Sequence, residues 1–363
     1  MYKKINQIKD SKIGFSANEE YLFAPKKEKG FMVYNLLDNK ISEYFTQYDV
    51  FEIIILSKSE FVVTENYARI GDIYVIRDKT IILQKELVTY SVKNIKSNFL
   101  EIGVTKEIEG FKSEWYPFTA LYDWQKDKIL WQASYDMFFF GDYIIGRRFN
   151  APHRLNPLTG ELLWSFSFAD FGKVKDVFGI EEAVSVHSFN KAFTGVVGNQ
   201  LWVTLNTWQH LVLDIDTGKQ LALLGDIYNY KETYEGQYLA GGGIIDAKNN
   251  KIISLGNAMY REINCTTFEI TFYDLREEFE KHSVNSIGDI IIDEDYIYFY
   301  DKKFMGINQC CKVAVLDRNS LKVVWSYDFA LLGSFPMQME KTENNLFVLD
   351  GNGTLHIFER ENE

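Results

Sequence analysis

The three cysteines are the first candidates for a chemical role in this sequence, because cysteine thiolates can ligate metals. Cys310 and Cys311 are neighbours in the segment NQCCKVAVLD, and Cys265 stands alone earlier in the chain. A structural zinc site needs a full set of thiolate or imidazole ligands at recognisable spacings, which these three thiols do not provide. An odd number of cysteines is typical of a reducing compartment. We therefore expect reduced thiols and no bound metal.

Two segments resemble ligand-binding loops but lack the residues that such loops need. In DIDTGKQLALLGD, which starts at Asp214, glycine is the fifth residue of the calcium-loop pattern rather than the sixth. Gly225 stands where a calcium loop has its bidentate glutamate, so we expect an ordinary turn. The run Gly241–Gly243 is not followed by a helical pattern, which disfavours a phosphate-binding loop and favours close approach of strands.

The histidines give no recognisable catalytic arrangement. None has a cysteine or serine partner at a known spacing, and the five are spread over the chain: His153, His187, His210, His282 and His356. The fold could still bring some of them together, so a catalytic cluster stays open. From the residues alone we predict no catalytic residue, no metal ligand and no cofactor.

The elements of this chain are turns followed by alternating strands. In NPLTGELLWSFSF, from Asn156 to Phe168, Asn-Pro favours a type I turn and Gly160 can adopt the left-handed conformation that closes it. After the turn, every second residue is apolar, with Trp164 among them. This period of two predicts a half-buried strand.

The same turn and strand recur along the chain. The eighth residue after the first polar residue of the turn is a tryptophan in three copies: Asn156 leads to Trp164, Asp123 to Trp131 and Asp317 to Trp325. Weaker copies are YNLLDNKISEYF, with Asn39 in the glycine position, LDIDTGKQLAL, the shortened VIRDKTIILQK and the degenerate FYDLREEFEKH from Phe272. The seven copies are on average about 47 residues apart, a spacing typical of repeat architectures.

Each copy is preceded by another strand-like run, and helical periodicity is nearly absent. The runs are Tyr21–Ala24, Phe61–Thr64, Phe99–Val104, Tyr143–Gly146, Leu201–Leu205, Lys251–Leu255 and Tyr296–Tyr300. Only Ile180–Phe189 could form a helix of any length. Repeats of this length with about four strands each predict an all-β fold, a β-propeller of four-stranded blades.

The two ends of the sequence indicate how the propeller closes. After the seventh copy, NNLFVLDGNGTLHIFERENE forms a hairpin pattern that lacks an outer strand, while Tyr2–Ile8 is a spare strand at the other end. If strands from both ends of the chain form one blade, the propeller has eight blades, which is the arrangement that we favour. Seven blades, with one weak unit as an insertion, is the alternative. Residues 1–363 would then form a single domain.

The pattern Asn/Asp-x-x-Thr-Gly-Glu/Lys-x-x-Trp resembles the PQQ-like repeats of quinoprotein-dehydrogenase-like propellers. That family contains enzymes and also non-catalytic scaffolds, such as a propeller lipoprotein of outer-membrane barrel assembly. The resemblance implies that Trp131, Trp164 and Trp325 pack between blades. Its enzymes also have neighbouring cysteines, but a disulfide between Cys310 and Cys311 would be strained and would need oxidising conditions. We therefore favour the non-catalytic branch.

Composition excludes several classes of function. A net charge of −12 disfavours nucleic-acid binding. The longest apolar runs are too short to span a bilayer, and no secretory signal is visible near Met1. We expect a cytoplasmic protein without membrane insertion.

One rim of the propeller is the expected binding face. The connections between second and third strands of the blades carry a net charge of +4 and at least one aromatic residue each: Phe31, Tyr67, Phe111, Trp115, Phe149, Trp208, Tyr260 and Phe304. Arginine and aromatic residues are enriched at protein interfaces. The predicted partner-binding residues are Arg147, Arg148, Trp208, Tyr260, Arg261 and Phe304. Acidic residues in the blade-to-blade connections on the same rim offset the charge, so the aromatic argument is the stronger.

The sequence thus predicts a non-catalytic, cytoplasmic propeller that binds another protein through the loops of one rim. An antidote or immunity protein, which sequesters a toxin by covering its active surface, is one specific form of this function. The alternative is an enzyme with a site in the central channel, either a quinoprotein or a carbohydrate-active hydrolase with paired carboxylates.

Overall fold

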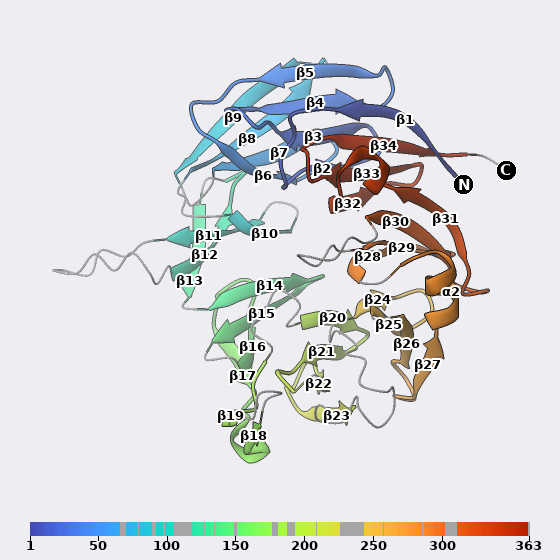
Figure 1. Ribbon diagram of the computed structural model, residues 1–363. Helices are drawn as coiled ribbons and strands as arrows, with labels where there is room; N and C mark the ends of the chain where they lie inside the picture. Colours follow the sequence, from blue (N-terminus) through green and yellow to red (C-terminus); the bar gives the residue numbers. More distant parts are fainter. Residues whose placement is uncertain are drawn as a thin grey trace. The chain divides into compact units, whose positions relative to one another are not determined.

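The computed structural model describes most of the chain. The described residues are 1–65, 70–78, 80–88, 92–96, 99–104, 118–126, 128–133, 135–148, 151–175, 181–186, 193–207, 209–225, 243–256, 258–284, 287–301 and 311–361. Within them, eight sheets have four strands each, and consecutive strands are neighbours in every sheet (Figure 1).

The first four sheets follow one another in the chain. Sheet 1 consists of β2 (Ser16–Ala17), β3 (Tyr21–Pro25), β4 (Phe31–Asn35) and β5 (Lys40–Tyr44), and sheet 2 of β6 (Val50–Ile55), β7 (Glu60–Glu65), β8 (Ile70–Arg77) and β9 (Thr80–Val88). Sheet 3 consists of β10 (Val92–Lys96), β11 (Phe99–Val104), β12 (Phe118–Asp123) and β13 (Lys128–Ala133), and sheet 4 of β14 (Asp136–Phe140), β15 (Tyr143–Arg148), β16 (Ala151–Leu155) and β17 (Leu162–Ser165).

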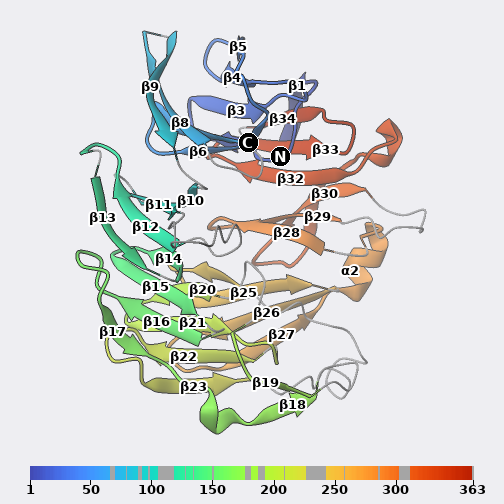
Figure 2. The same cartoon turned by 90° about the vertical axis from the view of Figure 1, so that its left-hand side faces the viewer.

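The remaining sheets repeat this arrangement. Sheet 5 consists of β20 (Phe193–Val197), β21 (Gln200–Thr204), β22 (His210–Asp214) and β23 (Gln220–Leu224), and sheet 6 of β24 (Ile244–Asp246), β25 (Lys251–Gly256), β26 (Met259–Asn264) and β27 (Ile270–Asp274). Sheet 7 consists of β28 (Ile287–Ile292), β29 (Tyr296–Asp301), β30 (Lys312–Asp317) and β31 (Val323–Asp328). The hairpin of β18 (Lys173–Lys175) and β19 (Glu181–Ala183) lies between sheets 4 and 5 in the sequence, and Figure 2 shows the strands of sheet 4 in order.

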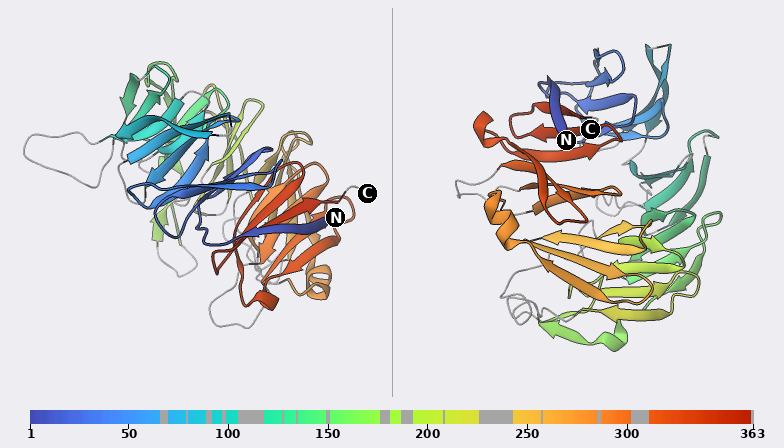
Figure 3. Two further views of the ribbon diagram at one scale, coloured as in Figure 1. Left: turned by 90° about the horizontal axis from the view of Figure 1, so that it is seen from above. Right: turned by 90° about the vertical axis from the view of Figure 1, so that its right-hand side faces the viewer.

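Sheet 8 joins the two ends of the chain, as the sequence predicts. Its strands are β32 (Pro336–Lys341), β33 (Asn345–Asp350), β34 (Leu355–Arg360) and β1 (Tyr2–Ile8), and β1 pairs antiparallel with β34. The termini consequently lie side by side (Figure 3). The bounds of the spare strand match those predicted. Tyr2 and Ile8 are buried, and alternate residues between them are exposed.

By contact density the chain divides into two compact units. One contains Met1–Ser134, Phe299–Ala314 and Val324–Glu363, and the other contains Tyr135–Tyr298 with Val315–Val323. The first unit holds sheets 1, 2, 3 and 8, and the second holds sheets 4, 5 and 6. Strands of sheet 7 belong to both units.

The turn between third and fourth strands is the repeated element that the sequence marks. Its first residue accepts hydrogen bonds from following backbone N–H groups: Asn156 Oδ1 from Leu158 (2.9 Å), and Asp214 Oδ1 from Thr217 (2.7 Å). The turn closes with a positive φ, 73° at Gly160 and 57° at Asn39. The Asp214 segment is therefore the predicted turn, and its carboxylate is used within the protein.

The sixth copy of the turn begins at Asn264 and not in the segment from Phe272, where the sequence predicted it. Asn264 Oδ1 accepts the N–H groups of Thr266 (2.8 Å) and Thr267 (3.0 Å), and Phe268 takes the glycine position with φ 61°. The segment from Phe272 contains instead the end of β27 and the short helix α2 (Arg276–Lys281). A bulky residue with positive φ hides the turn from a search for glycine or asparagine.

The segment in which the sequence allows a helix, Ile180–Phe189, is not helical where the structure describes it. Glu181–Ala183 is strand β19, which pairs with β18. Val184 and Val186, which follow this strand, are buried in the same cluster as Val203, and pairing with β18 satisfies the backbone of β19.

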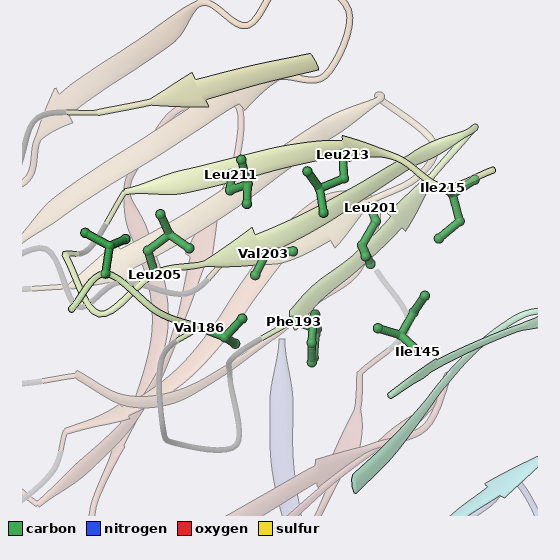
Figure 4. Packing of buried hydrophobic residues seen from close by; sticks show 10 residues of the cluster. Ile145, Val186, Phe193, Leu201, Val203, Leu205, Leu211, Leu213 and Ile215 are labelled. Atoms are coloured by element: carbon green, nitrogen blue, oxygen red, sulfur yellow. The ribbon is translucent and has the colours of Figure 1, made fainter. Parts of the chain in front are cut away.

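The hydrophobic core consists of clusters between the faces of the sheets. In the second unit, Val203 and Leu211 from neighbouring strands of sheet 5 are completely buried, and Ile145 of sheet 4 packs in the same cluster (Figure 4). Phe166 and Phe168, which follow β17, pack against this cluster. The alternating apolar residues of the Asn156 segment therefore join sheet 4 to sheet 5.

The repeat tryptophans Trp164 and Trp325 form hydrogen bonds to the next sheet in their unit. The indole Nε1 of Trp164 donates to Ile215 O of sheet 5 (2.8 Å), and that of Trp325 donates to Tyr2 O of sheet 8 (2.9 Å). Trp131 is 8% exposed. A tryptophan in the fourth strand can thus satisfy a carbonyl of the following sheet while its ring covers apolar surface.

Candidate functional site

Arg147 and Arg148 end strand β15 and stack on aromatic rings. Arg147 Nη2 lies 3.1 Å from Asp136 Oδ2, and its guanidinium lies 5.6 Å from the centre of the Phe138 ring. The guanidinium of Arg148 lies 5.7 Å from the ring centre of Tyr135, and its side chain is exposed. Of this pair, Arg148 is therefore the one that a partner could reach most easily.

Tyr260 and Arg261 are not loop residues, which corrects the expectation from the sequence. Gly256 pairs with Met259, so the connection is tight and both residues belong to β26. Tyr260 is 1% exposed and Arg261 5% exposed. Both side chains are committed to the interior and cannot serve as exposed partner contacts. Trp208 and Phe304 lie outside the described residues.

Arg261 is part of a buried polar cluster. Its Nη2 donates to His210 Nε2 (2.9 Å) and to Ser254 Oγ (2.9 Å). Burial first, and the guanidinium charge second, lower the pKa of His210 well below its usual value. His210 is therefore neutral and accepts through Nε2, which suits a structural role.

The aromatic residues predicted on this rim are mostly outside the described chain. The two that are described, Phe31 and Tyr260, are 0% and 1% exposed and belong to the core. Phe31 stacks on Tyr44, with ring centres 5.3 Å apart. An aromatic residue at the edge of a loop can begin the next strand and turn inward, which this sequence pattern does not distinguish.

Exposed apolar side chains do gather at one end of sheets 8, 1 and 2. In a four-stranded meander, the connection after the second strand and the connection to the next sheet lie at the same end. Among the described residues, six large apolar side chains in or beside such connections of the first unit are exposed: Ile13 (49%), Phe45 (74%), Phe51 (52%), Leu331 (88%), Leu332 (45%) and Phe335 (37%). We call this set the apolar rim patch.

Backbone hydrogen bonds join the segments that carry the patch. Gly351 N donates to Phe335 O (2.8 Å) and Ser11 N donates to Gly353 O (2.9 Å), which link the β31–β32, β33–β34 and β1–β2 connections. Lys12 N donates to Pro25 O (3.0 Å). The scaffold therefore holds these connections next to one another, although they come from both ends of the sequence.

A pocket opens within the apolar rim patch. Its volume is about 340 Å³, and its walls include Ile13 and Phe51 together with Lys12, Lys27 and Asp49. This volume lies within the range of ligand pockets, roughly 300–1,000 Å³. Charged groups beside apolar walls are typical of a site that holds its ligand in one orientation.

The patch lies mainly in the sheet-to-sheet connections, whereas the aromatic residues predicted at the rim come from the connections between second and third strands. Phe45 follows Tyr44 directly, and neighbouring strand residues face opposite sides. Tyr44 packs against the cluster around Phe31, so Phe45 faces solvent, where Lys26 Nζ lies 4.8 Å from its ring centre. Two adjacent aromatic residues at the end of an outer strand therefore indicate that one of the two rings is exposed.

The thiols show no catalytic character in the described residues. Cys265 is buried, and burial raises the pKa of its thiol to about 11. Cys311 is also buried, and Cys310 lies outside the described residues. Among the residues that the structure describes, no group of three or more His, Cys, Asp or Glu side chains could hold a metal ion.

Glu340 on β32, an edge strand of sheet 8, gives a prediction about pH. Burial raises the pKa of its carboxyl to about 7, so the folded state holds a proton that the unfolded state releases above about pH 4.3. Stability should therefore fall as pH rises from about 4.3 to 7. We expect Glu340→Gln to remove this decline and to stabilise the protein at pH 8 by about 1–3 kcal/mol.

Chemical denaturation at pH 5 and pH 8 measures this effect. Glu359→Gln, at an exposed position of β34, is the control and should leave the pH dependence unchanged. Equal pH dependence in the parent protein and the Glu340→Gln variant would contradict the prediction.

Comparison with known proteins shows the class to which this fold belongs. No family model and no curated protein matches the sequence. Solved structures do match: the computationally designed Ika8 protein has a TM-score of 0.63 at 10% identity and covers 98% of both chains. BamB from Moraxella catarrhalis has a TM-score of 0.63 at 11% identity, over 100% of this chain and 99% of its own.

Sqt1 from Saccharomyces cerevisiae has a TM-score of 0.63 at 10% identity and covers 99% of both chains. With these neighbours and its four-stranded sheets, the chain is an all-β protein with the β-propeller fold, and β1 and β34 share one blade. No helix among the described residues is long and apolar enough to cross a membrane.

Proposed function

We propose that this protein is a non-catalytic β-propeller that binds another protein through the apolar rim patch. The observation that carries the proposal is the set of six exposed apolar side chains at one end of sheets 8, 1 and 2. Contiguous apolar surface with a polar surround is typical of protein interaction sites. Its backbone is held by hydrogen bonds between connections, so binding would not have to order it first.

The finer parts of the proposal rest on the sequence. The Asn/Asp-x-x-Thr-Gly turn with a following tryptophan supports a PQQ-like propeller of eight blades, with residues 1–363 in one domain. The odd number of cysteines, which suits a reducing compartment, supports a cytoplasmic protein. A rigid rim that covers a partner's surface would suit an antidote that sequesters a toxin. Arg147, Arg148, Trp208 and Phe304 stay predicted contacts of the same partner.

The partner is to be identified by affinity purification from the native cell and mass spectrometry, and its affinity measured by calorimetry. We expect Leu331→Asp and Phe45→Asp each to weaken binding by about 2 kcal/mol or more, because a charge would be buried in an apolar contact. Both positions are exposed, so stability should change by less than about 0.5 kcal/mol.

Leu158→Asp is the matched control. Leu158 is 80% exposed and lies in a connection between third and fourth strands, at the opposite end of its sheet. It should leave the affinity unchanged. Unchanged binding by all three variants would refute the apolar rim patch as the binding face.

A further inference from the structure

The pocket in the apolar rim patch contains two lysines and one weakly held carboxylate. Lys27 Nζ donates to Asn352 O (2.6 Å), which uses one of the three N–H donors of an ammonium. Lys12 Nζ lies 3.7 Å from Asp49, beyond the distance of a direct hydrogen bond. The Asp49 side chain is 62% exposed. Asp49 is thus a loosely bound counter-ion at the mouth of the pocket.

The second carboxylate beside the pocket is fully used by the scaffold. Asp350 Oδ1 accepts the N–H groups of Asn352 (3.0 Å) and Thr354 (2.9 Å), and its Oδ2 lies 2.9 Å from His356 Nε2. Asp350 therefore belongs to the turn between β33 and β34. Once Asp49 moves away, Lys12 and Lys27 are the charged lining groups with hydrogen-bond donors that an anionic ligand could accept from.

A buried hydroxyl also borders this pocket. Ser11 is 1% exposed, and its Oγ has no hydrogen-bond partner among the described residues. Buried polar groups are rarely left without a partner, and such exceptions are found at binding sites. Ser11 and the two lysines thus give the pocket a polar part of its lining, while Ile13 and Phe51 give it an apolar part.

We propose that this pocket receives the carboxylate of an aspartate or glutamate side chain of the protein partner. The carboxylate pairs with Lys12 and Lys27 and displaces Asp49, and an apolar neighbour in the same partner segment packs on Ile13 and Phe51. The inference rests on the proposed function and specifies the chemistry of the partner at one point of the rim. The pocket would therefore recognise an acidic residue that stands next to an aromatic or aliphatic residue in the partner.

A library of random peptides displayed on phage, selected on the full chain, tests the proposal without knowledge of the partner. We expect enriched peptides to contain Asp or Glu next to an apolar residue. Synthetic versions should lose at least tenfold in affinity for Lys12→Gln and for Lys27→Gln. They should bind Asp49→Asn more tightly, because the competing carboxylate is gone. A pocket that binds cations would show the opposite response to Asp49→Asn.

Lys29→Gln is the matched control. Lys29 lies in the same turn as Lys27 and also donates to a backbone carbonyl, Gln47 O (2.8 Å), but it does not line the pocket. It should leave peptide affinity unchanged, and melting curves confirm that each variant is folded. A Lys27→Glu chain should select peptides with Lys or Arg in place of the acid.

Several outcomes would overturn the inference: no enriched peptide, enriched peptides without acids, or binding that is indifferent to Lys12, Lys27 and Asp49. If the natural partner is lost on Leu331→Asp but is indifferent to Lys12→Gln and Lys27→Gln, the inference fails while the proposed function stands. If Leu331→Asp and Phe45→Asp have no effect on the partner, the proposed function fails instead.

Discussion

Deletion of Met1–Lys9 is expected to lower the free energy of unfolding by at least about 4 kcal/mol, from lost apolar burial and lost backbone hydrogen bonds. The deletion removes β1, which pairs with β34 from Tyr2 to Ile8. Ile8 is 4% exposed and packs with Phe15 and Leu355. The deletion also removes the carbonyl of Tyr2, which accepts from Trp325 Nε1.

Equilibrium denaturation by urea measures this loss, and light scattering reports the second consequence. Without β1, strand β34 becomes an unpaired edge, which is a template for association with other chains. Lys3→Ala, at an exposed position of β1, is the control and should change stability by less than about 0.5 kcal/mol. A truncated protein as stable as the parent would refute the shared sheet.

Gly218→Ala is expected to destabilise the protein by about 3 kcal/mol, from left-handed strain and a clash with the half-buried Trp164 ring. Gly218 has φ 70°, and a methyl group there would lie 2.7 Å from the Trp164 ring. Trp164→Ala should itself cost about 3 kcal/mol, since it removes a packed aromatic ring and the hydrogen bond to Ile215 O. Denaturation of the two single variants measures both values.

The double variant separates the two causes. Without the Trp164 ring, Gly218→Ala should cost only the backbone strain, about 1–2 kcal/mol. Gly198→Ala is the matched control, because Gly198 has φ 59° and open space where the methyl group would be. Gly198→Ala should lower the free energy of unfolding by the same amount as Gly218→Ala does without the Trp164 ring, about 1–2 kcal/mol, and the two values should agree to within about 0.5 kcal/mol. Strictly additive single effects would show that Trp164 does not pack on this turn.

The sequence predicted the strands and their order because these depend on local patterns. The strand-like run before each turn predicted the second strand of seven sheets, and the spare strand Tyr2–Ile8 with the unfinished C-terminal hairpin predicted sheet 8. Asx turns fix the fourth strand through hydrogen bonds within five residues, as at Asn156 and Asp214. Only the Asn264 turn was missed, where Phe268 adopts a positive φ.

The exposure of side chains at the rim was decided by tertiary structure alone. Tyr260 and Phe45 look equally available in the sequence, yet they are 1% and 74% exposed. Tyr260 turns inward because the connection before it is tight and β26 begins at Met259. Phe45 turns outward because Tyr44 packs on Phe31 from the neighbouring strand.

The pocket depends on tertiary structure even more strongly. Ser11 and Lys27 come from the first sheet and its approach, whereas Asp350 comes from near the end of the chain. They meet because β1 completes the last sheet and delivers the chain directly to the first. A local pattern determines which residues form a strand or a turn. Contacts between residues hundreds of positions apart determine which of them form a surface.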